Sequence, residues 1–347
     1  MNRRRRMKKT GTILIVCAAA LGLAAMGARP NQAQVRLSFQ IATGGVAGTY
    51  YPIGQMLASI ISHPPGVARC EVAGRCGPEG LLAAAKASQG SVANAQAVND
   101  GRVASALVQA DIAADAYRGM GSFKGTGGLP NLRAVADLFP ELVHLVARKG
   151  AKIARLADLK RRRVSIDTGG SGTQATVRKI LAAAGLNETN VKFVFENPER
   201  SAAMLGAGEL DAFFVVGGPP FDIITELAKS DAIALVPLEG RAMESLVKTS
   251  PELRVARVPE NVYPGIPATK TLSVAAIWVV GANTSDDLVY AITRALWNPA
   301  NRVLLDSGHP MGVLIRPETA TMNLPIPLHP GAERFYRELQ APSPIPQ

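Results

Sequence analysis

Two short glycine-rich stretches have the composition of anion-binding loops. Residues 43–49 read Thr-Gly-Gly-Val-Ala-Gly-Thr, and residues 168–173 read Thr-Gly-Gly-Ser-Gly-Thr. Glycine permits positive φ and close backbone approach, and a helix start presents free N–H groups and the positive end of its dipole. The pair of loops therefore predicts a site for a small carboxylate or phosphate. Glycine-rich turns that connect a strand to a helix are also common in α/β proteins, where the glycines serve only to form the turn. A purely structural role for these glycines is therefore the alternative.

Neither loop has the pattern of a nucleotide site. The first loop lacks the Lys and Ser/Thr of a P-loop, and neither has a full G-x-G-x-x-G spacing followed by an acidic residue. A small anion therefore fits the loops better than a nucleotide, and we expect no cofactor.

The sequence around the loops shows no catalytic arrangement. Neither loop contains a His, and no G-x-S-x-G elbow surrounds Ser171. Asp167 is the best candidate for a general base, but it is more simply interpreted as a residue that braces the second loop. The four His residues of the chain are scattered without the spacing of metal ligands, so we expect no metal site. We therefore expect a binding protein, and an exported α/β enzyme is the less favoured alternative.

Strand and helix patterns alternate around both loops. Residues 35–41 alternate apolar and polar side chains before the first loop, and apolar residues at helical spacing follow it from Ile53 to Ile61, with Thr49 able to cap that helix. A strand over residues 164–167 and a helix over 174–184 flank the second loop. This alternation predicts an α/β fold with parallel sheets.

Length, composition and charge exclude several classes of protein. The 347 residues are 47% hydrophobic and include 33 Gly, 24 Pro and 3 Cys, which excludes a disordered chain and a disulfide-stapled miniprotein. One core seldom grows past about 250 to 300 residues, so we expect two lobes.

Most of the excess positive charge lies at the N-terminus. Seven of the 38 basic residues lie in the first 33 positions, and the remaining 31 basic and 27 acidic residues give the rest of the chain a net charge of +4. This balance predicts no nucleic-acid partner.

The first 33 residues have the form of a secretory signal peptide. A basic stretch over residues 3–9 precedes an apolar run over 11–27 and several small residues. An uncleaved anchor is the alternative, although the run falls short of the roughly 20 residues that span a bilayer. We expect an exported, soluble protein in which Cys70 and Cys76 form a disulfide. Two buried free thiols are the alternative, and a metal site is less favoured.

Seven segments, in order along the chain, resemble one family. The first reads Ile-Ala-Thr-Gly-Gly-Val-Ala-Gly-Thr-Tyr-Tyr-Pro-Ile-Gly, and the others follow at 90–94, 108–113, 143–148, 170–173, 211–218 and 324–333. Together they are similar to the TAXI family of TRAP-transporter solute-binding proteins. The resemblance implies a type II periplasmic-binding-protein-like α/β fold with a cleft between two lobes. It also implies a periplasmic location, a small organic anion (an amino acid or carboxylate) as ligand, and an ion-driven TRAP membrane subunit as partner.

The resemblance also implies which residues face the ligand. They are Gly45, Gly48, Thr49, Tyr50, Ser91, Gln109, Ser171, Gly172, Thr173 and Gly217. Alternatives remain for three of them: Tyr50 as a core aromatic, Ser91 as a helix cap, and Gln109 within a polar network. The segment from Gly77 to Gln89 departs from the family pattern as an apparent insertion.

The expected lobes are discontinuous in sequence. Lobe I comprises residues 34–142 plus 281–347, and lobe II comprises residues 143–280. We expect the chain to cross near residues 143–148 and 272–280, which are apolar and rich in β-formers. We expect a monomer. A ligand sensor that docks on a signalling receptor would use the same cleft and is the alternative function.

Overall fold

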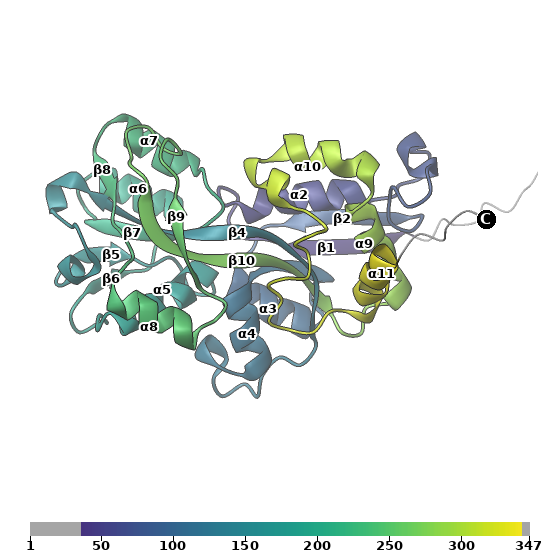
Figure 1. Cartoon of the computed structure of the whole chain (residues 1–347), viewed down its shortest axis with the longest axis horizontal. Coiled ribbons are helices and arrows are strands. Elements are labelled where there is room, and N and C mark those ends of the chain that lie inside the picture. Colours follow the sequence, from purple (N-terminus) through teal and green to yellow (C-terminus); the bar gives the residue numbers. More distant parts are fainter. Residues whose placement is uncertain (1–35, 342–347) are drawn as a thin grey trace, which may run out of the picture. The chain divides into compact units, whose positions relative to one another are not determined.

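One mixed sheet runs through residues 36–341, the part of the chain that the computed structural model describes. Its ten strands follow the order β2-β1-β3-β10-β4-β7-β5-β6, with β8 beside β4 and β9 beside β10 (Figure 1). The strands are β1 (Leu37–Ala42), β2 (Leu81–Lys86), β3 (Ser105–Gln109), β4 (Leu132–Arg148), β5 (Arg163–Ser165), β6 (Lys192–Val194), β7 (Ala212–Gly217), β8 (Ile233–Leu235), β9 (Arg254–Val258) and β10 (Thr269–Gly281).

The sheet has two parallel halves joined by two long antiparallel strands. In the first half β1 pairs in parallel with β2 and β3, and in the second half β5 pairs in parallel with β6 and β7. Strands β4 and β10 run antiparallel to each other, with β3 on one side and β7 on the other. The expected parallel pairing is found within each half, whereas at the centre two antiparallel strands pass from one half to the other.

Helices cover both faces of the sheet (Figure 1). Helices α3, α4, α5 and α8 pack on one face, and α2, α9, α10 and α11 pack with α6 and α7 on the other. The helices are α2 (Tyr50–Ile61), α3 (Ser91–Asn99), α4 (Ala110–Arg118), α5 (Gly172–Ala183), α6 (Pro198–Gly206), α7 (Asp222–Lys229), α8 (Arg241–Thr249), α9 (Asp286–Leu296), α10 (Arg302–Gly308) and α11 (Pro330–Gln340).

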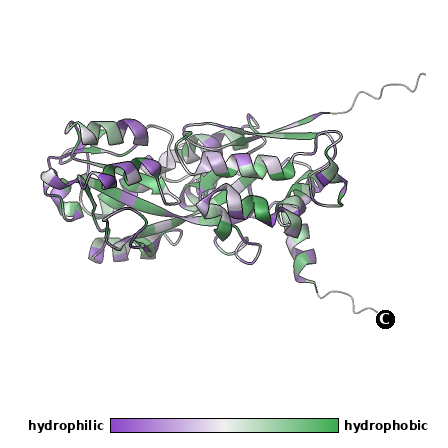
Figure 2. Cartoon of the chain, turned by 90° about the horizontal axis from the view of Figure 1, so that it is seen from above, coloured by the Kyte–Doolittle hydropathy of each residue, from purple (hydrophilic) through white to green (hydrophobic). Residues whose placement is uncertain are grey.

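The hydrophobic core follows the two faces of the sheet. One buried cluster extends under α3, α4, α5 and α8 across both halves, whereas each half has its own cluster on the opposite face. Figure 2 shows helices that carry both hydrophilic and hydrophobic residues, as expected for helices with one face on a sheet. The continuous cluster lets packing between the halves contribute to stability.

Two features of the chain are resolved by strand pairing. Pro140 does not interrupt β4, because it lies within the register of that strand with β10. The segment from Gly77 to Gln89 contains β2, which is paired along its length with β1, and its status as an insertion stays a prediction.

The Cys70–Cys76 disulfide is confirmed, with a Cα–Cα separation of 5.3 Å. The alternative of two free thiols is therefore wrong. Both side chains are buried beside a 3-10 turn over Ala68–Glu71.

The boundaries of the two lobes stay a prediction, since contacts group residues 37–347 into one compact unit. The predicted crossing points do lie on β4 and β10, and the C-terminal helices α9 and α10 pack against α2 of the first half. The expected signal peptide lies outside the described residues. Within residues 36–341, no helix is long and apolar enough to cross a bilayer.

Candidate functional site

A cavity of about 490 Å³ lies between the two glycine-rich loops and is lined from both halves of the sheet. The strand β1 leads into the first loop and β5 into the second, so the sheet places both helix starts at the cavity. Its polar and backbone lining includes Gly44, Gly45, Gly48, Thr49, Tyr50, Ser88, Ser91, Gln109, Glu141, Asp167, Thr168, Ser171, Gly172, Thr173, Asn197 and Glu199.

Nine of the ten residues proposed to face a ligand line this cavity. They come from four separate parts of the chain and meet because the strands end on the same side of the sheet. Gly217 is not among the lining residues. A Cβ added there would meet the Phe221 ring at 2.6 Å and Thr49 Oγ1 at 3.1 Å, so Gly217 lies behind these side chains. Whether the nine residues bind a ligand stays a prediction.

Thr49 joins the first loop to the second half of the sheet. Its hydroxyl donates to the Gly218 carbonyl at 2.9 Å and accepts from the Gly218 N–H at 3.1 Å. The expected capping of α2 by Thr49 is wrong, because the residue has helical dihedrals and its side chain makes no cap hydrogen bond. Among the described residues, no backbone acceptor takes the N–H of Tyr50 at this helix start.

The second loop is held by its own hydroxyls. Ser171 caps α5, with its Oγ accepting from the Gln174 N–H at 3.0 Å, and Thr173 Oγ1 accepts from the Val216 N–H at 3.2 Å. Asp167 has a φ of 75° and accepts from the Thr168 N–H at 2.7 Å, which fits the prediction that it braces the loop. Burial raises the pKa of the Asp167 carboxyl above its usual range, against the lowering effect of that N–H.

The start of α3 is bonded across to the second loop. The N–H groups of Val92 and Ala93 both donate to the Gly170 carbonyl at 3.1 Å. Ser91 is not the cap of α3, because the cap residue is Gly90 and Ser91 Oγ accepts from the Gln109 N–H at 3.1 Å. The two halves are thus in direct contact along one side of the cavity.

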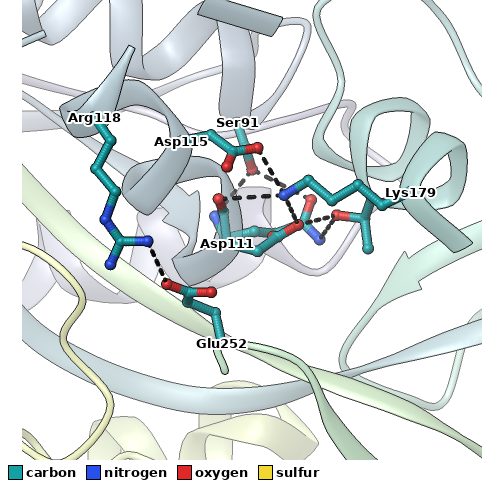
Figure 3. Close-up of polar contacts among 8 residues, drawn as sticks. Ser91, Asp111, Asp115, Arg118, Lys179 and Glu252 are labelled. Carbon is teal, nitrogen blue, oxygen red and sulfur yellow. Dashed lines mark hydrogen bonds and ion pairs between the residues drawn. The ribbon is translucent and has the colours of Figure 1, made fainter. Parts of the chain in front are cut away.

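Gln109 belongs to a polar network, as its alternative interpretation predicted. Its amide donates to Thr176 Oγ1 at 3.4 Å, and the Thr176 hydroxyl donates to Asp111 Oδ2 at 2.8 Å. Figure 3 labels Asp111, the member of this group that also pairs with Lys179. Gly172 packs so closely that a Cβ added there would lie 1.6 Å from Gln109 Oε1. Gln109 therefore contacts both the cavity and the junction of the halves.

Glu141 is a cavity residue that the sequence reasoning missed. It lies on β4, only 2% of it is exposed, and its Oε2 accepts from the Tyr50 hydroxyl at 2.6 Å. Burial raises the pKa of Glu141 to about 8, against the lowering effect of the Tyr50 hydroxyl. The available signal was an acid within a mostly apolar stretch of β-formers, since carboxylates are rarely buried without a function, although the same strand also carries the buried Asp137.

The cavity is rich in carboxyl groups. Glu141, Asp167 and Glu199 line it, whereas no Lys, Arg or His is among the described residues of its lining. Within residues 36–341, no group of three or more His, Cys, Asp or Glu side chains is placed so that it could hold a metal ion. Backbone N–H groups are therefore the main positive feature available to an anionic group, and those of Gly172 and Thr173 have no backbone acceptor among the described residues.

A hydrogen-bond chain behind the cavity fixes Phe221, which with Tyr50 is one of the two aromatic residues among the described residues of its lining. The Phe221 N–H donates to the Tyr263 hydroxyl at 3.3 Å, and that hydroxyl lies 3.2 Å from His144 Nε2. His144 Nδ1 lies 3.0 Å from the Leu142 carbonyl, and burial lowers the pKa of His144 to about 4. A neutral His144 with its proton on Nδ1 satisfies every member of this chain.

The sequence model of the NMT1-like family matches residues 41–339, which include every residue that lines the cavity. The chain belongs to the NMT1-like family. The match does not specify the TAXI family, so the narrower resemblance stays a prediction.

Several solved structures are similar to this NMT1-like protein over most of its length. A protein from Bordetella bronchiseptica RB50 is 19% identical, with a TM-score of 0.48, and the similarity covers 88% of this chain and 84% of that one. The periplasmic aliphatic sulphonate binding protein SsuA from Escherichia coli is 14% identical, with a TM-score of 0.45 and coverage of 87% and 79%. A binding protein component of an ABC phosphonate transporter from Pseudomonas aeruginosa is 10% identical, with a TM-score of 0.49 and coverage of 78% and 79%.

The predicted fold class is confirmed in the topology of the NMT1-like chain itself. It is a mixed α/β fold of the periplasmic-binding-protein type, with helices on both faces of a central sheet and two long strands that connect its halves.

Proposed function

We propose that the protein is an exported solute-binding protein that captures a small organic molecule in this cavity and delivers it to a membrane transporter. The observation that carries the proposal is the cavity itself. It lies between two halves of the sheet, has a volume suited to a small molecule, and is lined by hydroxyl, amide, carboxyl and free N–H groups.

The contacts across the cavity favour a clamshell mechanism. Thr49 bonds to Gly218 and α3 bonds to Gly170, and both contacts join the first half of the sheet to the second. Long strands at the centre can bend as a hinge while these contacts open and close. A ligand that contacts both halves of the sheet would then stabilise the closed form.

The lining supports binding more than catalysis. The hydroxyls of Ser171 and Thr173 lie beside the Asp167 carboxyl and each accepts from a backbone N–H, an arrangement that braces the second loop. No His is among the described residues of the lining to act as a base for them. The Tyr50 hydroxyl donates to Glu141 and so holds that carboxyl in place.

The transporter is expected to be of the TRAP type, on the resemblance of the sequence to TAXI proteins. An ABC transporter is the alternative partner, and a signalling receptor is the alternative for a sensing role. Uptake of labelled ligand into vesicles that contain the membrane subunits separates these cases. An ion gradient without ATP should drive uptake for a TRAP partner, and a requirement for ATP would contradict that assignment.

The binding function is tested first by a thermal-shift screen of the mature protein with amino acids, dicarboxylates, keto acids, sulfonates and phosphonates. Hits are then titrated by calorimetry. A bound ligand whose affinity falls on substitution of cavity residues supports the function. If no compound of these classes raises the melting temperature, the proposal is contradicted.

A further inference from the structure

We infer that Glu141 selects a ligand that carries a protonated amine beside its anionic group, so that the cavity binds zwitterions and disfavours simple anions of the same size. This inference rests on the proposed function and concerns the chemical class of the ligand.

The position of Glu141 points to a ligand group. Its Oε2 is occupied by the Tyr50 hydroxyl, but no described residue donates a hydrogen bond to its Oε1. The residue is almost completely buried and lines the cavity. Because Oε1 has no donor among the described residues and is not one of the fully buried atoms without a partner, it is accessible from the cavity, and a donor on the ligand can bond to it. An ammonium group provides that donor together with an opposite charge.

The charges around the cavity lead to the same class of ligand. Asp167 and Glu199 add further carboxyl groups, and the described lining contains no basic side chain. A simple anion would meet these carboxyl groups with only uncharged donors, the backbone N–H, hydroxyl and side-chain amide groups, in compensation. A zwitterion places its positive end among the carboxyl groups and its negative end at the helix starts of α2 and α5.

Tyr50 connects the two ends of such a ligand. Its backbone N–H belongs to the start of α2, where no described backbone acceptor takes it, and its hydroxyl fixes Glu141. One residue therefore sets the position of the predicted anion site relative to the carboxyl. A protonated Glu141 that donates to an anion is the competing arrangement, and it predicts the opposite preference between ligands.

Matched pairs of ligands test the inference. The pairs are alanine and pyruvate, glutamate and 2-oxoglutarate, and taurine and ethanesulfonate, each titrated by calorimetry into the wild-type protein. We expect at least one amine-bearing compound to bind about tenfold or more tightly than its partner without the amine. Equal affinities within every pair that binds, or tighter binding of the compounds without an amine, would overturn the inference while leaving the binding function intact. No binding by any pair would contradict the binding function as well.

Substitution then assigns the preference to Glu141. In Glu141→Gln, which keeps the shape of the side chain, the amine-bearing ligand should bind about tenfold to a hundredfold more weakly. Its partner without the amine should bind as before or more tightly. Glu244→Gln, on the exposed side of α8, is the matched control and should leave both affinities unchanged. Melting temperatures check that each variant folds, and a preference that persists in a folded Glu141→Gln would overturn the assignment.

Discussion

Lys179 Nζ lies 3.0 Å from Asp111 Oδ2, so an ion pair joins α5 of the second half of the sheet to α4 of the first (Figure 3). The same ammonium lies 2.7 Å from Asp115 Oδ2. The side chain of Asp111 is fully buried, and only 22% of the Lys179 side chain is exposed. Burial lowers the pKa of Lys179, but the charges of Asp111 and Asp115 outweigh it and hold the pKa above its usual range. This cluster is therefore a charged contact that must separate if the halves open.

Replacement of Lys179 by Met should destabilise the protein and favour the open form. The change leaves the buried Asp111 carboxylate without its cation, a loss of about 3 kcal/mol in the free energy of unfolding. Urea denaturation measures this loss, and small-angle scattering of the ligand-free protein should show a larger radius of gyration. Arg118→Met is the control, because its partner Glu252 is 3.3 Å away and half of the Arg118 side chain is exposed. That pair should contribute less than about 1 kcal/mol.

Gly172→Ala should weaken ligand binding with a smaller effect on folding. The new methyl group would overlap Gln109 Oε1, which lies across the junction of the halves, and would lie 2.7 Å from Ser91 Oγ. The halves must then separate slightly, so we expect affinity to fall about tenfold or more, equivalent to about 1.4 kcal/mol. Gly169→Ala has no atom within 4 Å of its new Cβ and should bind ligand normally. Equal affinities of the two variants by calorimetry would contradict the close approach.

Thr49→Val tests whether the hydroxyl of Thr49 closes the cavity. The change keeps the shape of the side chain but removes both hydrogen bonds to Gly218. Each bond contributes about 0.5 to 1.5 kcal/mol, so the closed form should lose about 1 to 3 kcal/mol and affinity should fall accordingly. Thr49→Ser keeps the hydroxyl and should retain most of the affinity. A Thr49→Val protein that binds like the wild type would show that this contact does not limit closure.

The stability of the protein should fall as pH rises toward 8. The pKa of Glu141 is about 8 in the folded state, against an ordinary value of 4.5, so the folded state holds an extra proton between these values. This proton stabilises the folded state. Its contribution to the free energy of unfolding is complete below pH 4.5 and is lost as the pH rises through about 8. Tyr50 and Asp111 are the groups that act on Glu141 besides its burial. Below about pH 6.5 the lowered pKa of His144 acts in the opposite direction, because the unfolded state there binds the extra proton. Denaturant midpoints from about pH 6.5 to 8 should therefore decline in the wild type and less steeply in Glu141→Gln. Parallel pH profiles would contradict the raised pKa.

Loss of the disulfide should cost about 2 kcal/mol in the free energy of unfolding, as expected for a bond that closes a loop across a sequence separation of 6 residues. Urea denaturation of the double variant Cys70→Ser, Cys76→Ser and of the wild type, each with and without reductant, measures this cost. The variant should be insensitive to reductant. Two alkylatable thiols in the native secreted protein would contradict the disulfide in solution.

The intact mass of the secreted protein also tests the predicted removal of the signal peptide.

The glycine-rich loops and the disulfide were predicted well because their determinants are local. The loop at residues 168–173 carries its own turn glycines and its own cap, Ser171, and the helix that follows it begins at Gly172. The cysteines are close enough in sequence for their pairing to be considered without a fold. Alternating strand and helix patterns likewise predicted β1 and β5 to within a few residues.

The determinants of the cavity chemistry are not local, and only the tertiary structure revealed them. Tyr50 and Glu141 are 91 residues apart, and Thr49 and Gly218 are 169 residues apart. Sequence spacing contains no information on such pairs, so Thr49 was interpreted as a helix cap and Glu141 was overlooked. The amino-acid sequence by itself determined the two glycine-rich turns that lead from a strand to a helix start, and the structure places both at one cavity. Which carboxyl enters that site was decided by the path of β4 through the centre of the sheet, because strand pairing over long separations places side chains that no local pattern relates.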